Sequence, residues 1–135
     1  MILVDSSVWI AYFHNSAIWQ VGFLDFLLSR EPIAIGDLIL SEVLQGFKFD
    51  RDFEIAKELL SSLKICEMGG YENAVKSAEN YRTLRKTGIT VRKTIDVIIG
   101  TYCIKNNFQL LHNDKDFLPM EEILCLQCCK SDYFH

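Results

Sequence analysis

The chain has 135 residues, of which 50% are hydrophobic, and its formal net charge is −4 at pH 7. A chain of this length can form one domain and bury roughly two-thirds of the surface that it exposes when unfolded. Its composition excludes fibrous and disordered classes. It begins without the basic region of a signal peptide, and no apolar stretch reaches the roughly 18 residues of a membrane span. We therefore expect a cytoplasmic protein that does not contact a membrane.

The first half of the chain alternates short apolar runs with amphipathic segments. Asp37 and Asp50 are placed to cap helices, and Pro32 ends the helix before it. The predicted elements are a strand over 2–4, a helix over 8–13, a helix over 18–28, a strand over 33–35, a helix over 38–47 and a helix over 50–63.

The second half continues the alternation. Gly88 is suited to close a long helix in the left-handed conformation, Thr90 is suited to cap the next helix, and Asn106–Asn107 to end it. The predicted elements are a strand over 63–66, helices over 71–86 and 90–105, a strand over 109–112 and a fifth strand over 124–126.

Strands that alternate with helices predict a mostly parallel sheet covered on both faces, which is an α/β fold. The sequence has no linker, repeat or low-complexity stretch. We expect one domain over residues 1–135.

The five cysteines are an odd number in a chain without a secretion signal, which favours reduced thiols. The run CLQCC lacks a second ligand pair at the spacing of a zinc site, and His112 forms no such motif. We expect buried or incidental thiols.

Basic residues concentrate in one segment of this acidic chain. The stretch between Glu79 and Asp96 contains five of the 14 Lys and Arg residues and no acid: Arg82, Arg85, Lys86, Arg92 and Lys93. A solvated helix face and a contact surface for RNA phosphates are the two interpretations.

Three acids follow predicted strands. Asp5 comes after the first strand, and Asp114 and Asp116 come after the fourth. Sites in open parallel sheets form beyond the carboxyl ends of strands, so these side chains are expected to share one cleft. Ordinary turn chemistry is the alternative for each of them taken alone.

Two further acids lie in apolar helical contexts. Asp96 lies within KTIDVIIGTYCI, where an Asp is a poor helix residue and is costly to bury. Its alternative role is an ion pair with Arg92 or Lys93. Glu42 lies in DLILSEVLQGF, and a solvated helix face explains it equally well.

Carboxylates that share a cleft repel one another unless a cation binds between them. All-oxygen ligands favour hard ions such as Mg²⁺ or Mn²⁺, which can activate water and neutralise a phosphate. The residues alone thus indicate an acidic metal site without establishing that the acids converge.

Four segments in order, VDSSVWI, LILSEVLQGF, GITVRKTIDVIIGTYCI and LLHNDKDF, resemble the PIN domain of VapC-type toxins through nearly the whole chain. The resemblance implies a three-layer α/β/α sandwich and a Mg²⁺- or Mn²⁺-dependent endoribonuclease. It also implies a homodimer and a VapB-like antitoxin that occupies the active-site groove.

The resemblance also implies roles for individual residues. Asp5 and Asp96 match the acids most directly tied to the metal. Glu42 and Asp114 complete the acidic quartet, and Asp116 matches a further acid. Ser7 matches a hydroxyl residue that orders the first Asp, whereas His112 is expected to pack or cap.

Two other classes of protein remain as alternatives. A phosphoacceptor domain needs an acidic pair after the first strand, and this chain has only Asp5 there. A non-catalytic PIN-like scaffold or RNA-binding module is expected to have lost some of the acids, and this chain has all of them.

Overall fold

The computed structural model describes residues 1–131. Residues 132–135, the last four of the domain expected over 1–135, lie outside the described part. The elements in chain order are β1 (Ile2–Val4), α1 (Ser6–Phe13), α2 (Trp19–Leu28), β2 (Ile33–Gly36), α3 (Asp37–Leu44), α4 (Asp50–Ser61), β3 (Lys64–Cys66), α5 (Tyr71–Lys86), α6 (Thr94–Asn106), β4 (Gln109–Leu111), the 3₁₀ turn η1 (Lys115–Phe117) and α7 (Leu118–Leu124).

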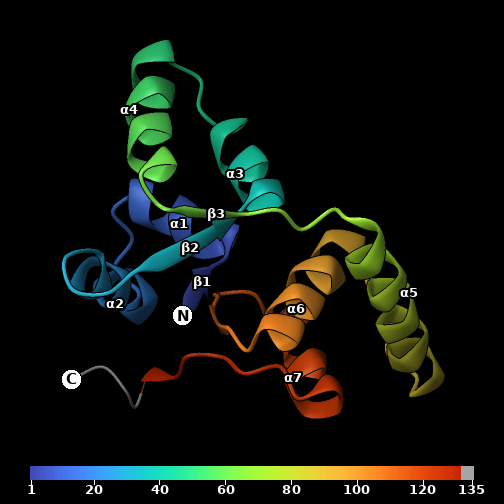
Figure 1. The fold of residues 1–135 in the computed structure, drawn as a ribbon. Helices are drawn as coiled ribbons and strands as arrows, with labels where there is room; N and C mark the ends of the chain where they lie inside the picture. Colours follow the sequence, from blue (N-terminus) through green and yellow to red (C-terminus); the bar gives the residue numbers. More distant parts are fainter. Residues whose placement is uncertain (132–135) are drawn as a thin grey trace.

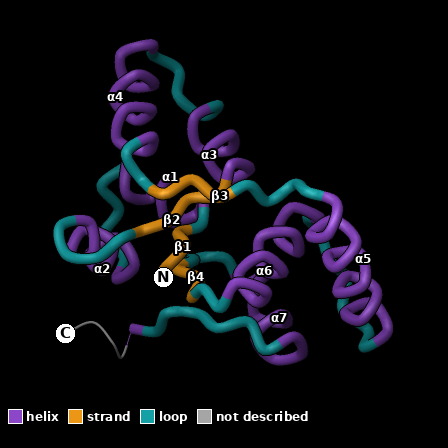
Figure 2. The backbone as a smooth tube through the Cα atoms, in the orientation of Figure 1, coloured by secondary structure: helices purple, strands orange, loops and turns teal. Residues whose placement is uncertain are grey.

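The four strands form one sheet in the order β3-β2-β1-β4, and every pair is parallel. The predicted parallel α/β fold is therefore confirmed. Helices α1 to α4 lie on one side of the strands and α5 to α7 gather on the other (Figures 1 and 2). Because all strands run the same way, the residues that follow β1, β2 and β4 meet at one edge of the sheet.

The sheet is the centre of the hydrophobic core, because its inner strands are buried on both faces. All four residues of β2 are buried, as are Leu3 and Val4 of β1. Trp9 of α1 and Phe117 of η1 are among the largest fully buried side chains. None of the helices between residues 1 and 131 is both long enough and apolar enough to span a membrane.

Several predicted helix ends are confirmed by backbone geometry. Gly88 has a φ of +88°, and it follows the last turn of α5. Asn107 adopts the left-handed conformation at the end of α6, with a φ of 56°. These positions need a positive φ, which Gly and Asn adopt at the lowest steric cost.

Several predictions were wrong. Asp37 and Asp50 do not cap α3 and α4: they are the first residues of these helices, and Gly36 and Phe49 occupy the N-cap positions. No strand forms over the expected range 124–126: Leu124 is the last residue of α7, Cys125 is its C-cap with a φ of 62°, and residue 126 lies in a loop. Only an isolated bridge between Leu110 and Cys128 extends the sheet there. Thr90 does not cap a helix, because α6 begins four residues later, after Lys93.

Candidate active site

Asp5 lies at the junction of β1 and α1, where it is the N-cap of the helix. Its Oδ2 accepts hydrogen bonds from the Ser7 hydroxyl at 2.6 Å and from the Ser7 backbone N–H at 3.1 Å. The residue is 3% exposed, and burial raises the pKa of Asp5 although the Ser7 bonds act in the opposite direction. The geometry agrees with the expectation that Ser7 orders this carboxylate.

Asp96 lies in the first turn of α6 and is 5% exposed. Its Oδ2 makes no hydrogen bond to any described residue, although Lys93 Nζ lies 3.4 Å away. Burial raises the pKa of Asp96 to about 6, with Lys93 opposing the shift and the charges of Asp5 and Asp114 adding to it. A carboxylate oxygen that is buried without a hydrogen bond is costly unless it has another role.

Asp114 and Asp116 follow β4 and begin the 3₁₀ turn η1. Asp114 Oδ1 accepts from the Asp116 backbone N–H at 2.9 Å, and its Oδ2 accepts from Lys93 Nζ at 2.8 Å. Partial burial raises the pKa of Asp114, but the bonds from Lys93 and Asp116 outweigh it, so that the pKa is lowered. This carboxylate is therefore ionised wherever Asp96 is.

Glu42 is on α3 and approaches the same place from the first half of the chain. Its Oε1 is buried and has no hydrogen-bond partner among the described residues. Burial raises the pKa of Glu42, and the negative charge of Asp5 raises it further. The charges of Asp114 and Lys93 also shift the pKa of Glu42, in opposite directions. Glu42 therefore belongs electrostatically to the acidic group.

The five acids predicted from the sequence lie around one site in the structure. Three of them are close enough to share a metal ion, and the other two interact with these three through their charges. Asp96, Asp114 and Asp116 each offer a carboxylate oxygen within 4.8 Å of the others. Asp5 and Glu42 interact with this triad through their charges.

The residues fit a hard divalent cation on two observations. The donor set consists of oxygens only, which Mg²⁺ and Mn²⁺ prefer. Asp96 Oδ2 and Glu42 Oε1 are buried without hydrogen bonds, so both oxygens keep lone pairs that a metal ion could use, although Asp96 Oδ2 also pairs with Lys93 at 3.4 Å. An acidic metal site is therefore compatible with this geometry.

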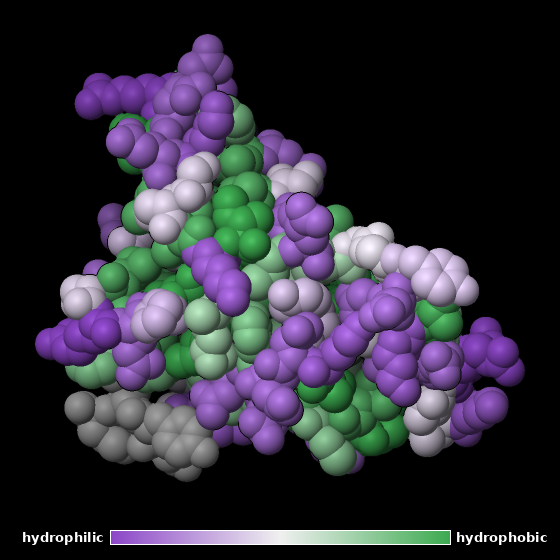
Figure 3. Space-filling view, viewed as in Figure 1, coloured by the Kyte–Doolittle hydropathy of each residue, from purple (hydrophilic) through white to green (hydrophobic). Residues whose placement is uncertain are grey.

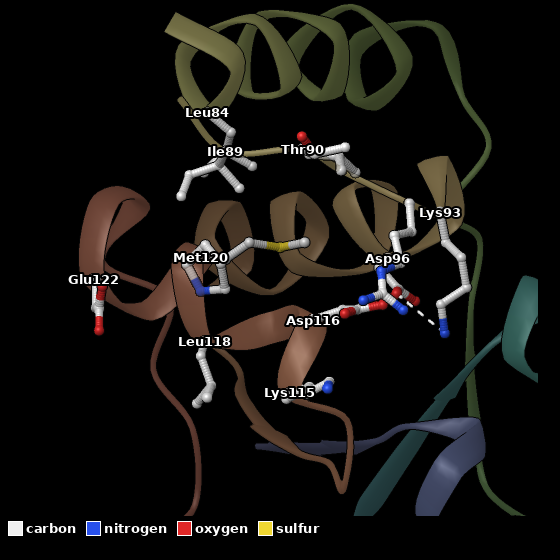
Figure 4. Close-up of a pocket in the computed structure, with 13 residues that line it drawn as sticks. Leu84, Ile89, Thr90, Lys93, Asp96, Lys115, Asp116, Leu118, Met120 and Glu122 are labelled. Atoms are coloured by element: carbon white, nitrogen blue, oxygen red, sulfur yellow. Dashed lines mark ion pairs between the residues drawn. The ribbon is translucent and has the colours of Figure 1, made fainter. Parts of the chain in front are cut away.

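A pocket of about 360 Å³ opens beside the triad. Figure 4 shows Lys93, Asp96 and Asp116 at one end and the apolar side chains of Leu84, Ile89 and Met120 at the other. The basic residues Arg92, Lys93 and Lys115 line its polar end. A phosphate group bound there would meet cations around a carboxylate centre.

The basic residues between Glu79 and Asp96 do not form one surface in the structure. Arg92 and Lys93 line the pocket, whereas Arg85 of α5 lies over the Tyr81 ring at 5.9 Å. From the sequence, Lys93 was expected to pair with Asp96 or to belong to a basic face that is solvated or contacts RNA phosphates, and a contact with Asp114 was not expected. Its bond to Asp114 joins residues 21 positions apart, and no local pattern signals it.

His112 lies beneath the Asp114 turn. Its Nδ1 accepts a hydrogen bond from the Asp114 backbone N–H at 3.1 Å, and its ring lies 4.9 Å from that of Phe117. Burial lowers the pKa of His112, so the ring is neutral near pH 7. The expectation that it packs and caps is confirmed.

Glu121 and Cys128 lie next to His112, with ligand atoms within 4.8 Å of one another. Because Nδ1 of His112 accepts a hydrogen bond, the neutral ring carries its proton on Nε2, which lies 3.8 Å from Glu121 Oε2. A metal would need the lone pair at that nitrogen, so the cluster suits hydrogen bonding better than zinc. All five cysteines are free, and four of them are buried.

Comparison with known proteins identifies relatives of the whole chain. The PIN domain family matches residues 2–122. A VapC ribonuclease of Mycobacterium bovis and ribonuclease VapC11 of Mycobacterium tuberculosis are each 30% identical over 129 residues, which cover 94% of this chain and 96% of the relative. The crystal structure of VapBC2 from Rickettsia felis bound to a promoter DNA fragment matches with a TM-score of 0.76 at 19% identity, over 96% of this chain and 98% of that chain. The chain therefore belongs to the PIN domain family, alongside the VapC ribonucleases.

Proposed function

We propose that this protein is a metal-dependent endoribonuclease that acts in the cytoplasm as the toxin of a type II toxin–antitoxin pair. The observation that carries the proposal is the convergence of five acids, two of which have a buried oxygen that accepts no hydrogen bond, in a relative of VapC ribonucleases. The same convergence disfavours the alternative of a non-catalytic scaffold, because several carboxylates buried close together repel one another and destabilise a fold that does not use them.

Asp96, Asp114 and Asp116 would hold the ion, and Asp5 adds its charge from the end of β1. A bound Mg²⁺ or Mn²⁺ would supply activation of water and neutralisation of charge at the scissile phosphate. Glu42 Oε1 is buried, unpartnered and of raised pKa, which suits it to accept a proton from the attacking water. Arg92 and Lys115 would hold RNA phosphates at the pocket mouth.

The test is cleavage of RNA by the purified, antitoxin-free protein. We expect cleavage with Mg²⁺ or Mn²⁺, none with EDTA, and none by Asp96→Asn. Asp25→Asn is the matched control, because Asp25 is an exposed acid on α2 outside the pocket. Cleavage that persists in EDTA would exclude the metal mechanism, and failure to cleave any RNA would favour the scaffold.

A VapB-like antitoxin is the second element of the proposal. Solved structures of related fold are toxin–antitoxin complexes from Rickettsia felis and Salmonella typhimurium. In Figure 3, apolar side chains gather over α3 and α4. Phe49 and Ile55 there are 69% and 55% exposed, and they line a cavity of about 380 Å³ with Phe13 and Phe47.

An antitoxin segment that covers these side chains would remove apolar area from water. Co-expression with the product of a small adjacent open reading frame should yield a complex without nuclease activity. Size-exclusion chromatography of the free protein tests the homodimer.

A further inference from the structure

Lys93 is the basic residue of the pocket that forms ion pairs with its acids. It precedes the first turn of α6, and its Nζ lies 2.8 Å from Asp114 Oδ2 and 3.4 Å from Asp96 Oδ2. Its own side chain is 48% exposed, whereas the side chains of Asp96 and Asp114 are 7% and 20% exposed. The ammonium group therefore reaches two largely buried carboxylates from a side chain that is about half exposed to solvent.

The two oxygens that Lys93 contacts belong to the triad that would hold the ion. A magnesium ion bound to both would lie about 2 Å from each oxygen. Since Nζ lies 2.8 Å and 3.4 Å from the same atoms, ion and ammonium would be within a few ångströms of each other. Two cations at that separation repel each other, and they compete for the same lone pairs.

We propose that Lys93 is an internal counter-cation that occupies the acidic site of the metal-free protein and leaves it when a divalent ion binds. The inference rests on the proposed metal site and deepens it. Once released, the ammonium group remains in the pocket that Arg92 and Lys115 also line, where the phosphate of a bound RNA is the available anion. Lys93 thus holds the carboxylates together in one state and contacts substrate in the other.

The exchange has two measurable consequences. Removal of the Lys93 charge relieves the competition, so the divalent ion should bind more tightly. It also leaves Asp96 and Asp114 unpaired when no ion is present, so the metal-free protein should be less stable. A residue that only stabilises the fold would produce the second effect without the first.

The experiment is calorimetric titration of chelator-treated protein with Mn²⁺, using Lys93→Met, which keeps most of the stem and removes the charge. We expect roughly a tenfold tighter Mn²⁺ dissociation constant for Lys93→Met, and a value near wild type for Lys93→Arg. Lys105→Met is the matched control, because Lys105 lies on α6, pairs with Glu72 of α5 and does not line the pocket. Melting temperatures in chelator should fall for Lys93→Met and recover with Mn²⁺.

Mn²⁺ affinity of Lys93→Met that equals or falls below that of the wild type would overturn the exchange, as would an absence of Mn²⁺ binding to both proteins. The RNA assay is a separate readout. Cleavage that requires metal together with unchanged Mn²⁺ affinity would refute the role of Lys93 alone. Tighter Mn²⁺ binding without cleavage of any RNA would support the exchange and refute the nuclease.

Discussion

The substitution Asp96→Asn measures how far the buried charge of Asp96 lowers the free energy of unfolding. The ordinary pKa of Asp is 3.8, and burial raises the pKa of Asp96 to about 6. Since one pKa unit corresponds to about 1.4 kcal/mol, the ionised carboxylate destabilises the metal-free fold by about 3 kcal/mol. The Asn amide loses hydration without a partner, at a cost of about 1–2 kcal/mol. The variant should therefore gain roughly 1–2 kcal/mol and melt about 3–6 °C higher in chelator.

The pH dependence follows from the direction of the shift. Because the pKa of the folded state lies above that of the unfolded chain, the penalty is complete above about pH 6 and disappears as the pH falls toward 3.8. Asp96→Asn should therefore melt above the wild type near neutral pH, and the difference should shrink and then reverse in sign on acidification, because the cost of burying the amide does not depend on pH. His112, Asp5 and Glu42 titrate in both proteins, so the comparison removes the contribution that they make in common.

The assay is thermal unfolding in chelator and in Mg²⁺ at several pH values, with Asp25→Asn as the control. Mg²⁺ should raise the melting temperature of the wild type by mass action and that of Asp96→Asn much less. A variant that melts clearly below the wild type in chelator, with no effect of Mg²⁺ on the wild type, would refute the reasoning. Asp96 would then be a structural partner of Lys93.

Three other perturbations test neighbouring parts of the site. Ser7→Ala removes the 2.6 Å hydrogen bond to Asp5, so we expect the free energy of unfolding, measured by chemical denaturation, to fall by about 1.5–3 kcal/mol and cleavage to weaken. Unchanged stability would contradict a role for this bond. Gly100→Ala places a methyl group 2.7 Å from Met120 Sδ, so we expect a loss of about 1–3 kcal/mol in the same assay, whereas a neutral result would mean that Met120 moves aside freely. Arg92→Ala should lower the slope of log RNA affinity against log salt by about one phosphate contact, measured on a catalytically inactive background, and an identical slope would place that guanidinium outside the RNA path.

The parallel sheet and the grouping of acids were predictable because both follow from local patterns. Asp5 and Asp114 each follow an apolar strand, and the carboxyl ends of parallel strands meet at one edge. Asp96 stood out because an Asp in an apolar helix is unfavourable without a role. Each of these features can be recognised from the few residues on either side of the acid.

The errors arose where a short segment depends on its tertiary surroundings. Residues 124–126 include the last residue of the short helix α7 and the loop that follows it, and an apolar run of three residues does not distinguish strand from helix end or loop. The helix ends with a positive φ at Cys125. A cysteine, unlike Gly or Asn, gives no signal in the sequence for this conformation. The position of Lys93 between two carboxylates depends on how β4 and α6 pack, which no local periodicity encodes.

The central place of β1 in the sheet has a consequence for when the protein becomes active. β1 pairs with β2 on one side and with β4, more than 100 residues later, on the other. Pairing across such a sequence separation closes a long loop and is intrinsically slow. During synthesis, Asp5 emerges first but meets Asp96, Asp114 and Asp116 only after β4 has left the ribosome and docked. The acidic site therefore assembles in the last stage of folding, and a nascent chain that lacks its C-terminal quarter cannot cut RNA.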